Sequence, residues 1–298
     1  MIRLGLCCKF YREPIRFRTT TARYTAGLSR AQQRKKLAEL CLANALSLRE
    51  SIEYCAGHGI GSFRVNSQVL PLRTHPEVGY DMTDLPGGHE IVKAFRACGP
   101  LARKNDIRLT FHPDQFILLS SADKEITRKS VQELEYQAEV SAWIGADVIN
   151  IHGGGAYGDK QSALTRVARN VRKLSRRVRK RLTVENDDRV YTPADLLPLC
   201  EDCKVPFVYD VHHHRCLPDG LSVEEVTDRA LATWDREPLF HVSSPRSGWK
   251  STKPQPHHDD IMIADFPECW RDLDVTVEVE AKAKELAVER LRKKLLKS

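Results

Sequence analysis

The chain has 298 residues, of which 41% are hydrophobic and 29% are charged. This composition excludes a largely disordered chain, and the length suits one α/β barrel, which typically needs roughly 250 residues. Lysine and arginine number 47 against 40 aspartates and glutamates, an excess that fits a polyanionic partner without requiring one. Nine scattered cysteines favour reduced thiols in a cytoplasmic protein over a secreted disulfide framework. No apolar run reaches the roughly 18 residues of a membrane helix.

Short apolar segments typical of β-strands alternate with longer amphipathic segments along the chain. The expected strands are Ile2–Leu6, Ile60–Val65, Ile107–His112, Asp147–His152, Leu182–Asn186, Pro206–Asp210, Leu239–Val242 and Asp274–Glu280. The expected helices include Arg30–Cys55, Lys124–Trp143, Ser162–Arg181, Val223–Trp234 and Lys282–Leu296. Eight strand–helix units favour a closed, parallel (β/α)8 TIM barrel over the alternative, a doubly wound open sheet. Since no linker or repeat interrupts the pattern, we expect residues 1–298 to form a single domain.

Six consecutive expected strands, the third to the eighth, each bring an imidazole or a carboxylate to the end where barrel enzymes place their active sites. These residues are His112, His152, Glu185, Asp210 (with His213 three residues later), His241 and Glu280. One histidine at a strand end is more often a satisfied core residue than a ligand. Six such positions in a row are hard to attribute to packing, because buried carboxylates and imidazoles gathered together need a cation to neutralise them.

The chemistry of this set indicates divalent metal ions. Mixed histidine and carboxylate ligation without thiolates suits Mn²⁺, our first expectation, or Zn²⁺, and more than one ion. Paired metal ions are a common device for hydrolysing phosphodiesters. The residues therefore favour a metal-dependent enzyme that acts on a phosphodiester substrate.

The order of the motifs resembles that of the UV damage endonucleases, which share their barrel and trinuclear metal centre with the endonuclease IV class. The matching stretches run from MIRLG to EAKAKE and include FRVNSQVLPLRTHPEVGYD, HPDQF, IHGGGAYGDK, LTVENDD, D-x-x-HH and HVSSPRS. Each stretch alone is weak, but all of them in order at barrel spacing make a specific match. The resemblance implies a DNA repair endonuclease that hydrolyses the phosphodiester 5′ to UV photoproducts, with abasic sites as further substrates.

The same resemblance implies roles for the metal-ligand candidates, with two or three ions in each chain. It assigns Glu185 as a bridge between two ions, His112 and His152 to the first ion, Asp210, His241 and Glu280 to the second, and His213 and His257 to a third. Glu185, Asp210 and Glu280 are therefore also the expected catalytic residues. His257 fits the family pattern better than His258, and of the three consecutive histidines His212–His214 only the middle one has the required spacing from Asp210.

The resemblance also implies contacts with lesion-containing double-stranded DNA. Gln115 and Phe116, in the HPDQF turn, are expected to probe the duplex at the lesion. A non-functional alternative has Phe116 packed under the barrel rim. Arg64, His75 and Lys160 lie in matching stretches and are candidate phosphate contacts. No membrane or obligate protein partner is expected.

One departure from the family pattern concerns the metal centre. The family usually has a lysine two residues before the histidine of the seventh strand, and here that position is Leu239. We therefore expect weaker binding of the third ion. Two other functions stay open at this stage: a xylose-isomerase-like sugar isomerase or epimerase on the same barrel, and a DNA-binding relic without activity.

Overall fold

The computed structural model describes residues 2–114 and 116–296. Its strands form one closed barrel in which neighbours pair in parallel and in chain order. The strands are β1 (Arg3–Cys7), β2 (Ser62–Val65), β3 (Arg108–Phe111), β4 (Val148–His152), β5 (Leu182–Glu185), β6 (Phe207–Asp210), β7 (Leu239–Val242) and β8 (Thr276–Val279). The predicted (β/α)8 barrel is confirmed, and the open sheet is excluded.

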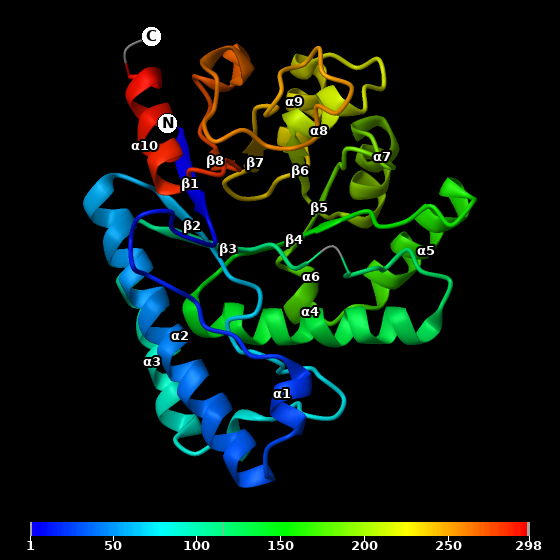
Figure 1. The fold of residues 1–298 in the computed structure, drawn as a ribbon. Coiled ribbons are helices and arrows are strands. Elements are labelled where there is room, and N and C mark those ends of the chain that lie inside the picture. The colour runs from blue at the N-terminus through cyan, green and yellow to red at the C-terminus, as the bar shows by residue number, and fades with distance from the viewer. Residues whose placement is uncertain (1, 115, 297–298) are drawn as a thin grey trace.

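Helices surround the barrel, with α2, α3 and α4 along one side and α7, α8 and α9 on another (Figure 1). The α-helices are α1 (Ala22–Ala26), α2 (Arg30–His58), α3 (Gly88–Lys104), α4 (Lys124–Ile144), α5 (Lys160–Lys173), α6 (Arg176–Arg179), α7 (Pro193–Cys203), α8 (Val211–Cys216), α9 (Val223–Ala232) and α10 (Glu285–Leu295). The 3-10 helices are η1 (Met82–Asp84), η2 (Ile263–Asp265) and η3 (Glu268–Trp270). No helix in this described part of the chain has the length and apolar character to cross a membrane.

The segment Ser162–Arg181, expected as one helix, is divided into α5 and α6. Leu174 takes an extended backbone conformation with ψ 151°, which ends the hydrogen-bonded run of α5. Ser175 then begins α6, and its hydroxyl accepts a hydrogen bond from the main-chain N–H of Val178. Serine at this position satisfies a main-chain N–H group that would otherwise lack a partner, which favours the new helix start.

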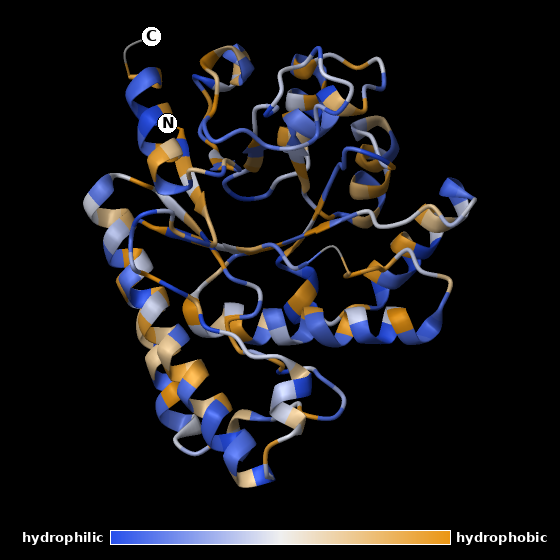
Figure 2. Ribbon diagram, in the orientation of Figure 1, coloured by the Kyte–Doolittle hydropathy of each residue, from blue (hydrophilic) through white to orange (hydrophobic). Residues whose placement is uncertain are grey.

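Alternating side chains along the strands give the barrel an apolar outer face and a polar interior. Outward residues such as Leu109 and Val277 are buried in the main hydrophobic core beneath the helices. Inward residues include Thr110 and Glu278, which hydrogen-bond each other across the barrel. In Figure 2 the strands are mostly orange, whereas the helices carry blue, hydrophilic residues on their outer sides. Since successive side chains of a strand point to opposite faces, the pattern concentrates polar groups inside the barrel.

A small apolar cluster lies inside the barrel beneath these polar groups. Val148, Val208 and Leu239 form it, and Trp234 packs against it. Leu239 precedes His241 by two residues on β7 and therefore shares its inward face. The cluster separates the polar end of the barrel from the opposite end, where Arg108 pairs with Asp147 at 2.8 Å.

We predict that Leu239→Ala lowers the free energy of unfolding by about 2–5 kcal/mol, because it leaves a cavity among fully buried side chains. Leu46→Ala is the matched control, since Leu46 lies on α2 and is 51% exposed; its effect should stay within about 0.5 kcal/mol. Urea denaturation of both variants measures the difference. Equal stability of the two variants would show that the cluster does not support the barrel.

Candidate metal centre

The strand-end candidates lie together at the C-terminal end of the barrel. The register of the sheet places His152 beside Glu185 on neighbouring strands, and Asp210 beside His241. His112 follows β3 directly, and Glu280 follows β8 directly. Because these positions share the inward face of their strands, their side chains converge on one site.

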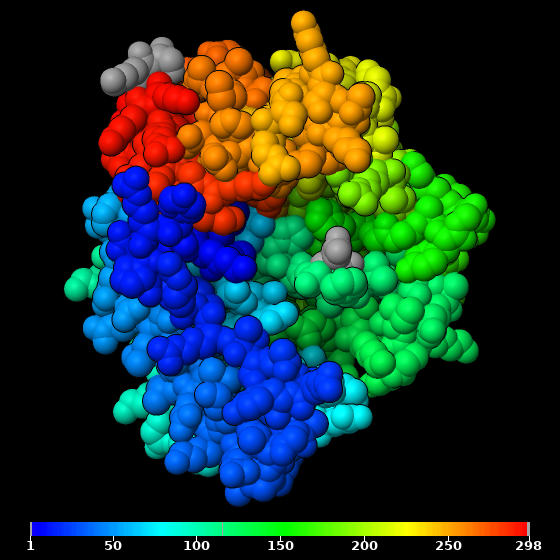
Figure 3. Space-filling model, in the orientation of Figure 1, coloured from blue at the N-terminus to red at the C-terminus, as the bar shows by residue number. Residues whose placement is uncertain are grey.

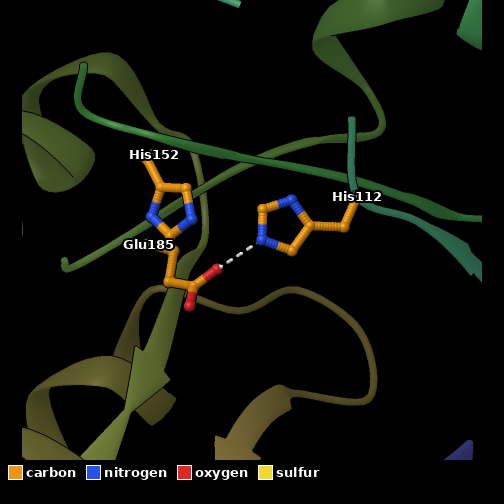
Figure 4. Close-up of side chains that lie close together, drawn as sticks. All are labelled: His112, His152 and Glu185. Carbon is orange, nitrogen blue, oxygen red and sulfur yellow. Dashed lines mark ion pairs between the residues drawn. The ribbon is translucent and has the colours of Figure 1, made fainter. Parts of the chain in front are cut away.

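Glu185 is the buried centre of this site. Its Oε2 lies 3.0 Å from Nε2 of His112, and its Oε1 lies 3.0 Å from Nδ1 of His241 and 3.4 Å from Nδ1 of His213. Asn150 donates a further hydrogen bond to Oε2. Figure 4 shows the Glu185 carboxylate between the rings of His112 and His152. Burial raises the pKa of Glu185, but the neighbouring histidines, above all His241, outweigh burial and hold the pKa well below its usual range.

Three groups of side chains have the proximity that a metal ion requires. Within each group the possible ligand atoms lie within 4.8 Å of one another. The groups are His112 with His152 and Glu185, His112 with His241 and Glu280, and Glu185 with Asp210 and His213. The first matches the sequence-based assignment, whereas the others divide the ligands differently, with Asp210 beside His213 instead of His241 and Glu280. Glu185 and His112 each belong to two groups, which is the arrangement expected of adjoining ion sites.

Several buried polar atoms in these groups have no hydrogen-bond partner among the described residues. They are Oδ2 of Asp210 and Nδ1 of both His112 and His152. A buried carboxylate oxygen without a partner is costly, because it loses its hydration without replacement. A cation beside Asp210 would remove that cost, so the donor set fits divalent metal ions.

Two of the neighbouring histidines, His213 and His257, approach the candidate ligands, whereas two others, His212 and His214, are held by partners outside the ligand set. The main-chain N–H of His213 donates a hydrogen bond to Asp210 Oδ1 at 2.8 Å, which holds His213 over the site at the start of α8. His257 approaches the site from the β7–β8 connection, with Nδ1 3.7 Å from Oε2 of Glu280. By contrast, His214 is buried against Tyr209 and Asp219, and Nε2 of His212 is 3.2 Å from the carbonyl oxygen of Gln255. Both lie buried around the site, not in solvent.

Arg64, expected to contact phosphate, is instead buried among carboxylates inside the barrel. Its Nη1 lies 2.6 Å from Oε1 of Glu280, and its guanidinium also pairs with Glu278. Glu278 in turn lies 3.2 Å from Nε2 of His241. Burial raises the pKa of Glu278, but Arg64 and His241 outweigh it and bring the pKa to about 2.

Glu278 is a site residue that the sequence interpretation missed. It precedes Glu280 by two residues in the run DVTVEVE. The period of a strand places two such residues on the same face, so this spacing was the available signal. Its carboxylate lies beside Nε2 of His241, a candidate ligand. In many metal sites such partners orient the ligands.

The described candidates for DNA contact lie in different parts of the chain. Phe116 is 69% exposed in the β3–α4 connection, which contradicts packing under the rim. Gln115 lies outside the described residues. His75 accepts main-chain hydrogen bonds from Glu77 and Val78 within its own turn. Lys160 pairs with Asp195 at 2.8 Å. The charges of Arg64 and Lys160 thus already have partners within the protein.

Comparison with known proteins identifies the family of this chain. The family model of the UV-endonuclease UvdE matches residues 2–298. A UV DNA damage endonuclease of Bacillus velezensis is 39% identical over 285 residues, which cover 93% of this chain and 87% of that protein. The crystal structure of SacUVDE superposes with a TM-score of 0.88 at 27% identity, covering 100% of this chain and 99% of the other. Endonuclease IV from Thermus thermophilus shares the fold, with a TM-score of 0.61 at 19% identity over 84% of this chain and 95% of the other. The chain therefore belongs to the UV-endonuclease UvdE family.

Proposed function

We propose that the protein is a metal-dependent DNA repair endonuclease that hydrolyses the phosphodiester 5′ to UV photoproducts and to abasic sites. The observation that carries this proposal is the buried Glu185 carboxylate, surrounded by imidazoles and next to an Asp210 oxygen without a hydrogen-bond partner among the described residues. Family membership supports DNA as the substrate. Lesion-containing double-stranded DNA is the specific substrate that we propose.

The residues proposed to hold the ions are Glu185, Asp210, Glu280 and their neighbouring histidines, His112, His152, His213, His241 and His257. Bound divalent ions supply Lewis-acid charge that polarises a phosphodiester and favours ionisation of water. The protein contributes orientation: Asn150 holds Glu185, and Thr183 in turn donates to Asn150 Oδ1 at 2.9 Å. Mn²⁺ is proposed first, with Zn²⁺ as the alternative. Because Leu239 offers no ligand, we propose two firmly held ions and a weaker third.

The sugar isomerase or epimerase is not favoured. Sugar isomerases typically hold two ions mostly with carboxylates, whereas imidazoles of His112, His152, His213 and His241 gather here. The exposed ring of Phe116, four residues after His112, is also better suited to stack on the bases of a nucleic acid than to contact a small sugar. An inactive relic is disfavoured because all three carboxylates, Glu185, Asp210 and Glu280, reach the site.

The proposed reaction predicts a 3′-hydroxyl and a 5′-phosphate at the nick, and loss of nicking in a chelator. Mapping the ends of a cleaved photoproduct duplex measures the first result, and addition of Mn²⁺ after chelation measures the second. A β-elimination end, or full activity in the chelator, would contradict metal-dependent hydrolysis.

Glu185→Gln is predicted to abolish nicking and to lower the metal content. The amide keeps the shape of the side chain but removes the charge that two candidate groups of ligands share. The loss of activity should therefore exceed the roughly 10–100-fold that is typical when a residue hydrogen-bonded to a metal ligand is replaced. Metal analysis and nicking assays test both effects. Glu50→Gln, an exposed residue of α2, is the control and should behave as wild type. Normal metal content in Glu185→Gln would exclude the shared-ligand role.

Phe116→Ala, alone or together with Gln115→Ala, is predicted to lose selectivity for photoproduct over intact duplex while keeping its metal. The buried neighbours Ile117 and Leu119 anchor the loop, so the exposed ring can stack on unpaired bases, an interaction worth roughly 1–3 kcal/mol. Activity on abasic duplex should fall less, because one base is already missing. Phe116→Trp keeps a stacking surface and should restore selectivity.

Parallel nicking of photoproduct, abasic and intact duplexes tests this role. Unchanged photoproduct selectivity in the Gln115→Ala/Phe116→Ala variant would remove the probing role from this turn. Metal analysis of the same samples separates a probing defect from damage to the metal centre.

A further inference from the structure

A cavity of about 520 Å³ adjoins the metal centre and has several basic residues in its lining. Glu280 and His257 are lining residues that the cavity shares with the metal centre, and Lys9, Lys282 and Lys284 are also among the residues that line it. In Figure 3 the blue N-terminal segment and the red C-terminal segment lie next to each other beside a hollow in this face of the molecule. The cavity therefore lies between the loop after β1 and the start of α10.

Lys9, Lys282 and Lys284 differ from Arg64 because their ammonium groups have no ion-pair partner in the part of the chain that the structure describes. Within residues 2–114 and 116–296, the hydrogen bonds and ion pairs give no partner to the ammonium groups of Lys9, Lys282 and Lys284. By contrast, Arg64 on the inner wall pairs with Glu278 and Glu280. The cavity thus presents uncompensated positive charge toward solvent.

The thiols in the cavity do not supply the missing negative charge. Burial raises the pKa of Cys8 to about 11, although Arg64 and Lys284 oppose that shift. Burial also raises the pKa of Cys7 well above its usual range. Both thiols are therefore neutral near pH 7, and Glu280, already paired with Arg64, is the acidic residue of the lining.

Hydrogen bonds hold the walls of the cavity in place. The buried carboxylate of Glu285 accepts hydrogen bonds from the main-chain N–H groups of Tyr11 at 2.6 Å and Arg12 at 2.7 Å. These bonds fasten the loop that carries Lys9 to the start of α10. On the other side, the N–H of Lys282 donates to the carbonyl oxygen of His258 at 3.0 Å. The segments that carry the lysines are therefore held in place by hydrogen bonds within the protein.

Two residues of the lining have strained backbones. Cys8 has φ 59° and Lys284 has φ 50°, both in the left-handed region that side chains other than glycine seldom adopt. Such strain costs of order 1–3 kcal/mol and tends to collect at functional sites. Its occurrence on two walls of one cavity is a second indication, independent of charge, that this cavity has a binding role.

We propose that the cavity binds a phosphate of the DNA backbone next to the scissile phosphate, through Lys9, Lys282 and Lys284. This inference rests on the proposed function, since it places the neighbouring phosphate of the cleaved strand beside Glu280 and His257. Ammonium groups without acidic partners are suited to phosphate oxygens. The contact fixes the register of the strand over the metal centre, while Arg64 remains paired inside the barrel.

The test compares salt dependence of duplex binding by the metal-loaded protein and by the variant Lys9→Gln/Lys282→Gln/Lys284→Gln. Glutamine keeps much of the side-chain length and removes the charge. Loss of one phosphate contact should lower the slope of log affinity against log salt by about 0.9. The triple lysine-to-arginine variant should keep the wild-type slope, and so should the control Lys35→Gln, at an exposed lysine of α2.

Binding, metal content and nicking together separate this inference from the proposed function. A wild-type slope in the triple glutamine variant, with normal nicking by the wild type, would overturn the phosphate cavity and leave the endonuclease intact. A lowered slope in a protein whose wild type does not nick would support the cavity and contradict the proposed function. Loss of bound metal in the triple glutamine variant would overturn the inference, because the lysines would then act on the metal centre itself.

Discussion

The burial of the Glu185 carboxylate inside the barrel is the constraint around which the rest of the site is arranged. A carboxylate removed from water is unstable without compensating charge or hydrogen bonds, and three imidazoles and Asn150 approach this one. The same surroundings leave Asp210 Oδ2 without a hydrogen-bond partner among the residues that the structure describes. A site that gives one carboxylate several hydrogen bonds, and leaves one oxygen of its neighbour with only the imidazoles of His213 and His241 at 3.5 and 4.0 Å in the described part of the chain, is suited to take up cations.

Polar side chains inside the barrel stabilise the buried carboxylates of the metal centre. Inward positions close to the metal centre carry polar groups that hold one another, as when Thr110 and Arg64 both hold Glu278, which in turn faces His241. The apolar cluster around Leu239 lies beneath them. The candidate metal ligands are therefore gathered at one end of the barrel, apart from the Arg108–Asp147 pair at the other. The loops after the strands bring Phe116 to one side of the ligands and the lysine-lined cavity to the other.

The barrel fold and most of the candidate ligands could be predicted from the sequence, because strand periodicity is short and regular. The apolar runs predicted the strands of the barrel. The polar residue at the end of each run from the third to the eighth predicted which side chains converge at the metal centre. Long-range partners were not predictable: the guanidinium of Arg64 looked free in the sequence, yet it pairs with Glu278 and Glu280 across the barrel. The break at Leu174 depends on one backbone angle, which an amphipathic pattern does not specify.

The central claim is that Glu185 is held beside metal ions. Anomalous diffraction from crystals of the protein grown with Mn²⁺ tests it most directly, because the signal locates the ions independently of activity. The account predicts anomalous peaks within coordination distance of Glu185, with the imidazoles of His112 and His152 and the carboxylate of Asp210 turned toward them. Crystals that bind Mn²⁺ elsewhere, with Glu185 bonded only to imidazole and amide N–H groups, would contradict it.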